Sequence, residues 1–253
     1  MKVVPLVSIV TAAFNEEKNL LQIVPGWIET LSTNEVFLKR GFEIVLVDDG
    51  SSDSTWAAIQ RLAVDYPDII SMLRLEENRG AGFAFSCGLV QSRGEFIAIY
   101  DADGQYSVSH LLEASKYLSD SIAICGYRES RRAPFLQMVG SGFTNLLFKL
   151  LFGGDIVDPN CAWKIFPRSL LSVGPFPVGR KMVYSGEHSY MIQRSGIPVL
   201  NLPVTQLSRV EGKSGTKLLR DGAIRIVFFF YLWISQLLVK LGVIREITLG
   251  DRK

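Results

Sequence analysis

The sequence predicts an α/β protein with a mostly parallel, doubly wound sheet and an apolar helix near the C-terminus. Three observations support this fold class. Short apolar runs alternate with amphipathic stretches through the first half of the chain, the runs are almost uninterrupted by polar residues, and a long apolar segment follows near the end. With 253 residues, of which 48% are hydrophobic, the chain is large enough to bury such a core.

Five apolar runs in the first half are typical of strands that are buried on both faces, because they lack the polar alternation of a half-exposed strand. These runs cover residues 6–12, 42–47, 69–75, 96–100 and 122–125. Because helical stretches separate them, the strands require the crossover connections of a parallel sheet.

The amphipathic stretches between the runs are predicted to be helices. They cover residues 16–31, 54–64, 81–91 and 107–118. Asp53 or Ser54 is a suitable N-cap for the second of these helices, and Ser107 for the fourth. Pro25 is expected to bend the first helix or to end a segment of it, because proline lacks the N–H of a helical hydrogen bond.

The second half of the chain is less regular. It predicts a helix over residues 135–152, a helix over 182–194 and a strand over 198–204, with glycines after both helices. No internal repeat and no low-complexity linker is present. We therefore expect one domain, residues 1–215, with a helical tail, residues 216–253.

The tail contains an apolar segment, residues 223–244, in which only Arg225 and Lys240 are charged. Its uncharged part, 226–239, has 14 residues, fewer than the roughly 20 that span a bilayer. Its aromatic content and its basic flanks are typical of a helix that lies in a membrane interface or tilts shallowly into it. The alternative is a helix buried in the core or in a dimer interface.

The composition excludes several classes of protein. The net charge of +2, from 27 basic and 25 acidic residues, is not the large basic excess of a general nucleic-acid-binding protein. Three cysteines without a CxxC pair and two histidines predict neither a disulfide framework nor a Cys- or His-rich metal site, and they favour a reducing compartment. The N-terminal apolar run is interpreted as a strand rather than a signal peptide, because Pro5 interrupts it and no cleavage-type site follows.

Polar clusters follow three of the predicted strands: residues 14–16 (FNE), 48–53 (DDGSSD) and 101–105 (DADGQ). In an open α/β sheet, ligands bind beyond the carboxyl ends of the strands. Each cluster alone resembles an ordinary turn that contains Asp and Gly. Together they predict a ligand site at one edge of the sheet.

Asp101 and Asp103 are candidate metal ligands. Two carboxylates in one turn can converge on Mg²⁺ or Mn²⁺, with the amide oxygen of Gln105 as a third ligand; the alternative is a plain turn. Asp48 and Asp49 suit hydrogen bonds to ribose hydroxyls or to a base N–H. A dinucleotide dehydrogenase is not expected, because GxGxxG is absent after the first strand.

Basic residues gather at two further places. Arg128, Arg131 and Arg132 follow the fifth run, and Arg209, Lys213, Lys217 and Arg220 precede the apolar tail. Such groups favour a phosphate-bearing substrate or anionic headgroups. The alternatives are a solvated loop and a simple juxtamembrane anchor.

The motifs SIVTAAFNEE (8–17), VDDGSSD (47–53), NRG (78–80) and DADGQY (101–106) occur in one order and spacing. In this pattern, from about residue 6 to residue 220, the sequence resembles the family 2 glycosyltransferases of GT-A fold. It is most similar to the dolichol-phosphate mannose synthase and polyprenyl-phosphate glycosyltransferase subfamily. That similarity rests on DGQ after the DxD, GYR (126–128) and RVEGKSGTKL (209–218).

The resemblance implies roles for the matching positions. Nucleotide contacts are implied for Ala12, Phe14, Glu16, Asp48 and Asp49, and contacts to metal and diphosphate for Asp101, Ala102, Asp103 and Gln105. Phosphate contacts, to the donor or to an acceptor lipid, are implied for Arg128, Arg209, Lys213 and Lys217. Asp103 and Arg128 would act directly in catalysis, and Asp158 stands where the family motif D-x-x-S-G-F-R begins.

The chain departs from the family motifs at four places, one of which is the loop KSGTK (213–217), where Gly215 separates Ser214 from the next basic residue. Ala12 and Phe14 stand where proline and tyrosine are usual, and residues 158–164 read DPNCAWK. The acceptor-phosphate motif Arg-x-x-x-Ser is present as Gln137 to Ser141, without its arginine. These departures leave the acceptor open.

The resemblance implies an inverting, metal-dependent transferase that moves a hexose from a nucleotide-diphosphate sugar, of the GDP-mannose or UDP-glucose type, to a polyprenyl or dolichyl phosphate. A phosphate acceptor needs no strong base. One alternative is a transferase acting on a sugar hydroxyl in glycan synthesis, with Asp158 or Glu187 as base. Another is a non-catalytic, membrane-associated subunit that binds nucleotide sugar.

These expectations also give a location and partners. We expect a peripheral or monotopic protein at the cytoplasmic face of a membrane. Its partners would be the nucleotide-sugar donor, the polyprenyl-phosphate acceptor and the membrane surface, with a homo-oligomer or a membrane subunit as a further partner. Nucleic acid is not among them.

Overall fold

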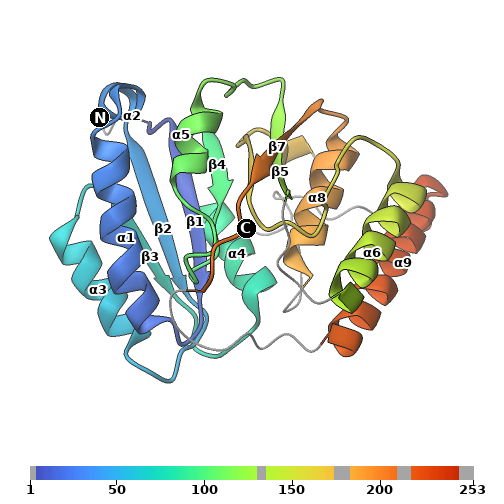
Figure 1. Ribbon diagram of the computed structural model, residues 1–253, viewed down its shortest axis with the longest axis horizontal. Coiled ribbons are helices and arrows are strands. Elements are labelled where there is room, and N and C mark those ends of the chain that lie inside the picture. Colours follow the sequence, from blue (N-terminus) through green and yellow to red (C-terminus); the bar gives the residue numbers. More distant parts are fainter. Residues whose placement is uncertain (1–3, 130–134, 174–182, 210–217, 245–253) are drawn as a thin grey trace.

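Strands from the described residues form one mixed sheet with helices on both faces (Figure 1). The computed structural model describes residues 4–129, 135–173, 183–209 and 218–244. The strands are β1 (Val7–Ala13), β2 (Phe42–Asp48), β3 (Ile70–Arg74), β4 (Phe96–Ile99), β5 (Ala123–Arg128), β6 (Lys164–Pro167) and β7 (Val199–Val204), in the order β3-β2-β1-β4-β6-β5-β7. The helices are α1 (Glu17–Ser32), α2 (Glu35–Arg40), α3 (Thr55–Asp65), α4 (Ala81–Gln91), α5 (Ser109–Ser115), α6 (Phe135–Phe152), α7 (Leu170–Val173), α8 (Tyr184–Ser195) and α9 (Leu218–Lys240).

The sheet is parallel except at β6. Strands β3, β2, β1 and β4 pair in parallel, as do β5 and β7, whereas β6 pairs antiparallel with β4 and β5. The six predicted strands are confirmed, with ends that differ by at most three residues. Strand β6 was not predicted, because its four residues (KIFP) carry no pattern of their own and its place depends on pairing with distant strands.

Alternate residues of the central strands point to opposite faces of the sheet. In β1, Ile9 packs in the core beneath α1, α3 and α5, and Val10 packs in the core beneath α4 and α8. Ile44 and Val45 repeat this division in β2. Both faces are therefore buried, which is why these strands are almost continuously apolar in sequence.

The predicted helices form, with three differences. Helix α1 continues through Pro25, so the expectation that proline ends a segment there is wrong. Helix α2 was not predicted; it is short and begins after Asn34, whose Oδ1 accepts a hydrogen bond from Val36 N (3.0 Å). Helix α5 is shorter than the stretch 107–118. Asp53 Oδ1 accepts from Thr55 N (3.0 Å) at the start of α3.

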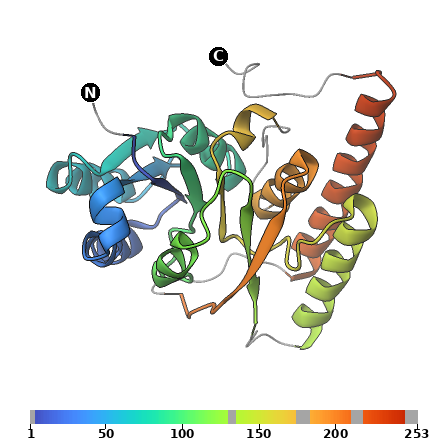
Figure 2. The same cartoon turned by 90° about the horizontal axis from the view of Figure 1, so that it is seen from above.

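Helices α6 and α9 lie side by side at the end of the molecule that is farthest from α1 and α3 (Figures 1 and 2). Phe229 of α9 is fully buried against Phe148 of α6, with 5.3 Å between the ring centroids. A Cβ added at Gly186 of α8 would lie 2.7 Å from Phe229, so α8 and α9 also approach closely. The tail helix is thus packed against the rest of the structure.

In the part of the chain that the structure describes, one helical stretch is long and apolar enough to cross a membrane, Arg220–Lys240, with 21 residues and a mean hydropathy of 1.8. It is longer than the 14 uncharged residues of the sequence because the helix continues through Arg225. The expectation that the segment is too short to span a bilayer is therefore wrong on length. Only 11% of its most apolar window is buried.

Substitution of two helical glycines by alanine should change the free energy of unfolding in opposite directions. A Cβ at Gly88 of α4 would lie 2.5 Å from Val10 Cγ1 in the buried layer, whereas a Cβ at Gly26 of α1 meets nothing within 4 Å. We expect Gly88→Ala to lower the free energy of unfolding by about 1–3 kcal/mol through overpacking. We expect Gly26→Ala to raise it by up to about 1 kcal/mol through helix propensity. Urea denaturation measures both, and a Gly88→Ala variant as stable as the wild type would contradict the packing described.

Candidate active site

The carboxyl ends of β1, β2 and β4 bring the three polar clusters to one edge of the sheet. Asn15 N, after β1, donates to Ser51 Oγ, after β2 (2.9 Å). The guanidinium of Arg209 then joins the first cluster to the third, since Nη1 lies 3.5 Å from Glu16 Oε1 and Nη2 lies 3.0 Å from Asp103 Oδ2. The expected common edge is thus found.

Asn15 shapes the turn after β1. It has a left-handed backbone (φ 57°), which asparagine tolerates better than most residues, and its Oδ1 accepts a hydrogen bond from Ser52 N (2.9 Å). The next residue, Glu16, donates its N–H to Thr55 Oγ1 (2.9 Å). The Glu16 carboxylate is therefore held at the edge, where burial raises its pKa.

Asp48 and Asp49 are buried and bind backbone N–H groups. The two oxygens of Asp49 accept from Arg79 N (2.8 Å) and Gly80 N (2.9 Å), which fixes the NRG loop beside the site. Asp48 Oδ1 accepts from Ser51 N (3.0 Å). Both side chains therefore shape the edge of the site, and their implied contacts to a nucleotide stay predictions.

Asp101 and Asp103 are held by different partners. The Tyr184 hydroxyl donates to Asp101 Oδ1. Asp103 Oδ1 accepts from Gln105 N (3.0 Å), and its other oxygen faces Arg209. Burial, and then the charge of Asp103, raises the pKa of Asp101 to about 7, and burial raises the pKa of Asp103. Two desolvated carboxylates in one turn thus form a center of negative charge.

This donor set fits a hard divalent cation. Among the described residues no group of three or more His, Cys, Asp or Glu side chains is placed to hold a metal ion, so a cation held by Asp101 and Asp103 would need further ligands from the substrate or from water. Mg²⁺ is commonly held in this way, by one or two carboxylates together with substrate phosphates and water. In this structure the guanidinium of Arg209 compensates part of the negative charge.

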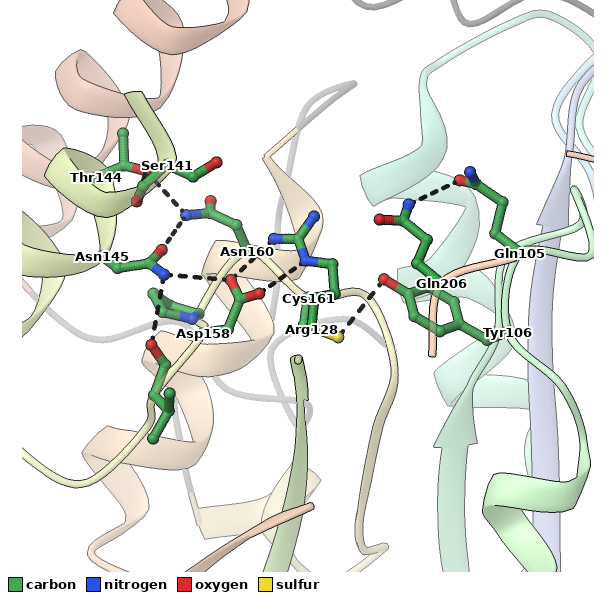
Figure 3. Close-up of polar contacts among 12 residues, drawn as sticks. Gln105, Tyr106, Arg128, Ser141, Thr144, Asn145, Asp158, Asn160, Cys161 and Gln206 are labelled. Atoms are coloured by element: carbon green, nitrogen blue, oxygen red, sulfur yellow. Dashed lines mark hydrogen bonds and ion pairs between the residues drawn. The ribbon is translucent and has the colours of Figure 1, made fainter. Parts of the chain in front are cut away.

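Gln105 binds the segment after β7. Its Oε1 accepts from Gln206 Nε2 (3.2 Å), as Figure 3 shows, and its backbone oxygen accepts from Leu207 N (2.8 Å). This pairing holds the segment that carries Arg209 over the DADGQ turn. The amide oxygen of Gln105 is engaged here, and its role as a metal ligand stays a prediction.

Three further residues with implied donor contacts lie on the same edge. Phe14 is exposed, Ala12 is half-buried and Ala102 is buried. Lys213 and Lys217, together with Arg131 and Arg132, lie outside the described residues.

Arg128 and Asp158 form a buried, bidentate ion pair at the end of β5 (Figure 3). Arg128 Nε donates to Asp158 Oδ2 (2.7 Å) and Nη2 to Oδ1 (2.9 Å), and the side chains are 11% and 8% exposed. Burial lowers the pKa of Arg128, but the hydrogen bonds and the charge of Asp158 outweigh it and raise that pKa. Asn145 of α6 also donates to Asp158 Oδ1 (3.5 Å). The pair is thus a fixed part of the structure.

A cavity of about 190 Å³ opens between this ion pair and α6. Its lining mixes hydrogen-bonding and apolar side chains. The lining residues are Tyr127, Arg128, Met138, Ser141, Gly142, Asn145, Val157 and Asp158. Ser141, the serine of the acceptor-phosphate motif that lacks its arginine, therefore lines the same cavity as Arg128. The side chain of Gln137, at the position of that arginine, lies outside the described residues.

The departure DPNCAWK has a structural explanation. Lys164 is fully buried, and its Nζ donates to the carbonyl oxygens of Cys161 and Pro159 (3.5 Å for Pro159). Burial lowers the pKa of Lys164. Trp163 packs edge-on against Tyr100, with 6.4 Å between ring centroids. These residues fix the turn that carries Asp158.

Glu187 is buried in α8, which places this predicted base inside the structure rather than at its surface. Tyr184 was not predicted from the sequence as a site residue. It lies outside the matched motifs, and only the packing of α8 places it beside Asp101. Arg225 was noted in the tail only for its charge, although α9 carries it toward Arg128.

Comparison with known proteins identifies a family model and two enzymes of one kind. The model described as "Glycosyl transferase family 2" matches residues 8–175. The dolichyl-phosphate beta-glucosyltransferase of Homo sapiens is 31% identical over 226 residues, which cover 81% of this chain and 68% of that protein. That of Dictyostelium discoideum is 27% identical over 254 residues, which cover 91% of this chain and 76% of that protein.

Solved structures show the same fold. A mannosyltransferase from Pyrobaculum calidifontis, in complex with GDP-Man and Mn²⁺, superposes with a TM-score of 0.62 at 22% identity, over 91% of this chain and 64% of that chain. At this level of identity the likeness concerns the fold.

Proposed function

The chain belongs to glycosyl transferase family 2 and has the GT-A fold, and from this premise we propose that it transfers a hexose from a nucleotide-diphosphate sugar to a polyprenyl phosphate. The observation that carries the proposal is the cavity beside α6. Arg128 lines this cavity and would face the acceptor phosphate, while the carboxylate of Asp158 is engaged in an ion pair with Arg128. The two similar dolichyl-phosphate glucosyltransferases support this class of acceptor.

The donor binds at the edge of β1, β2 and β4. Asp101 and Asp103 would hold Mg²⁺ or Mn²⁺ together with the donor phosphates. When bound, the cation neutralises the charge that grows on the leaving diphosphate. Arg209 already lies beside Asp103, so it is well placed to donate hydrogen bonds to the same diphosphate.

The acceptor supplies the nucleophile. A phosphate oxygen of the lipid attacks the anomeric carbon on the face opposite the diphosphate. The new carbon–oxygen bond forms as the bond to the diphosphate oxygen breaks, and the nucleoside diphosphate leaves with the electron pair, so the configuration inverts. No proton has to be removed, because a phosphate monoester is already ionised near pH 7.

A hydroxyl acceptor would need a base to remove its proton. Neither candidate, Asp158 or Glu187, has a carboxylate that is accessible to such an acceptor. Both oxygens of Asp158 accept hydrogen bonds from Arg128. Glu187 is 6% exposed in α8. A base must reach the proton that it removes. This geometry favours the phosphate acceptor over the alternative of a sugar hydroxyl.

Arg225 of α9 extends the positive charge beside Arg128. Helices α6 and α9 run in the same direction side by side (Figures 1 and 2), and Phe229 packs on Phe148. Arg225 lies one turn before Phe229 and is therefore near the level of Thr144, one turn before Phe148. That level of α6 lines the cavity.

The surroundings of Arg225 favour an anion. It is half-buried, and the effects of burial and of Arg128 on its pKa are opposed only in part by Asp221 and Asp158. Burial, and then the nearby charge of Arg128, lowers its pKa. A phosphate between the two guanidinium groups would relieve this repulsion. We therefore infer that Arg225 takes the place of the arginine that is absent at position 137.

The outer side of α6 and α9 forms an apolar surface, which we propose to lie in the membrane interface. It consists of the exposed residues Val139, Phe143, Leu146 and Leu150 of α6 and Ile224, Val227, Tyr231 and Ile234 of α9. Because Phe229 and Leu232 are buried on the protein side, α9 would lie along the membrane rather than cross it. The acceptor cavity is lined by α6, so a lipid with its tail in the membrane could bring its phosphate to Arg128.

Sugar transfer into an organic-extractable product tests the proposed reaction. The purified chain, given polyprenyl phosphate, Mg²⁺ or Mn²⁺, and labelled GDP-mannose or UDP-glucose in parallel, should place label in the organic phase. We expect Asp103→Ala to lower the rate by roughly 10²–10³-fold, because it removes electrostatic stabilisation of the leaving group. Asp65→Ala, an exposed position in α3, is the control. Binding of nucleotide without transfer to the lipid from either donor would contradict the acceptor class.

The role of Arg225 predicts a selective loss of acceptor affinity. Arg225→Gln should raise KM for polyprenyl phosphate about tenfold, as expected for one charge-assisted hydrogen bond, and leave KM for the sugar donor within about twofold. Lys240→Gln removes a positive charge from the distant end of α9 and should change neither constant. Equal effects of the two variants would show that only the general attraction of the helix to the membrane matters.

Binding to lipid vesicles tests the apolar surface. Val227 and Tyr231 are 68% and 62% exposed, and burying such side chains contributes about 1.5 kcal/mol or more each. Val227→Glu with Tyr231→Glu should therefore reduce co-flotation with vesicles of phosphatidylglycerol and phosphatidylcholine at least tenfold. Val64→Glu on α3, a valine that is even more exposed (78%), should leave it unchanged. Undiminished flotation of the double variant would exclude this surface as the membrane contact.

A further inference from the structure

Tyr184 is the first residue of α8, and its hydroxyl donates a hydrogen bond to Asp101 Oδ1 across 83 residues of sequence. It is the described side chain that holds this carboxylate at the end of β4. A group that hydrogen-bonds a metal ligand fixes the orientation of that ligand.

The ring of Tyr184 is held in place by two others. Phe85 of α4 stacks on it, with ring centroids 4.7 Å apart and an angle of 29° between the planes. His188, one turn along α8, lies edge-on to Tyr184 (6.0 Å) and to Phe85 (5.9 Å). The hydroxyl therefore cannot leave Asp101 without disturbing a packed cluster.

His188 acts in this cluster as a neutral aromatic ring. It is fully buried, and neither ring nitrogen has a hydrogen-bond partner among the described residues. Burial lowers its pKa to about 3. The cluster thus places one hydroxyl at the acidic edge and adds no charge there.

The partners of the two carboxylates differ in a way that matters for a cation. Arg209 contacts Asp103 with a positive charge, which would compete with an arriving cation. Tyr184 contacts Asp101 with a neutral donor, which can stay bound to one oxygen while the other remains available. Arg209 is therefore a partner to be displaced, and Tyr184 a partner that remains.

We propose that Tyr184 is a positioning residue, which holds the Asp101 carboxylate in the orientation that binds the divalent cation of the donor site. The inference rests on the proposed function for the identity of the ligand. The Tyr184 hydroxyl makes no contact with the sugar in this role, and it acts only through Asp101.

Binding of Mn²⁺ to the full chain tests the proposal without any acceptor. Mn²⁺ is titrated in the presence of GDP or UDP, and the bound ion is followed by electron paramagnetic resonance and by calorimetry. We expect Tyr184→Phe to raise the Kd for Mn²⁺ by roughly 10–100-fold, the usual effect of removing a group that orients a metal ligand. Phe85→Leu, which loosens the ring without removing the hydroxyl, should raise it less. Tyr190→Phe removes a hydroxyl from the same helix away from Asp101 and should leave it unchanged.

Kinetics separate positioning from a general loss of structure. In Tyr184→Phe the Mn²⁺ concentration for half-maximal transfer should rise with the Kd, and kcat should largely recover at saturating Mn²⁺, with an unchanged thermal melting curve. A Kd within twofold of the wild type, or a kcat that stays low at saturating metal, would overturn the proposal. A wild-type chain that binds no Mn²⁺ would overturn it as well, and lipid-linked transfer would then still decide the proposed function separately.

Discussion

The structure depends on the crowding of acidic side chains at one edge of a sheet that is buried on both faces. Desolvation and mutual repulsion oppose this arrangement, so each carboxylate needs a donor. Asp49 takes fixed backbone N–H groups, whereas Asp101 and Asp103 are held by the side chains of Tyr184 and Arg209. A carboxylate held by backbone N–H groups shapes the site. Asp103 can exchange its partner Arg209 for a ligand, whereas Asp101 keeps Tyr184 on one oxygen and has a second oxygen for a ligand. This difference distinguishes the residues that build the edge from those available to a ligand.

Transfer between two phosphate-bearing substrates requires positive charge at both ends of the reacting sugar, because the donor diphosphate and the acceptor phosphate repel each other. The donor end has Arg209 and the carboxylates suited to a cation. The proposed acceptor end has Arg128, which its ion pair with Asp158 keeps in place, and Arg225 from a different helix. In the proposed reaction Asp158 would orient the guanidinium of Arg128, which is a different role from that of a catalytic base.

The doubly wound sheet and the common edge could be predicted from the sequence. Buried strands and the polar turns after them produce patterns within a few consecutive residues. Strand β6 could not be predicted, because its four residues form a strand only through pairing with the distant strands β4 and β5. The implied contacts of Gln105 and Asp49 stay predictions, and the structure adds that both side chains also bind neighbouring segments. Tyr184 was missed for a similar reason. Its hydrogen bond to Asp101 depends on the packing of α8 against α4, and a contact between distant segments leaves no pattern in the local sequence.

Helix α8 connects the sheet edge that carries Asp101 to helices α6 and α9. Its first residue, Tyr184, contacts Asp101, while Gly186 lies against Phe229 of α9 and Tyr190 packs on Phe152 of α6 (4.9 Å between centroids). One rigid helix therefore fixes the distance between the proposed cation site and the apolar surface. If the lipid phosphate enters from that surface, as proposed, the same helix also fixes where the nucleophile meets the sugar. Under the proposed function, close packing at Gly186 would serve catalysis as well as structure, since a shift of α9 there would move Arg225 relative to the donor.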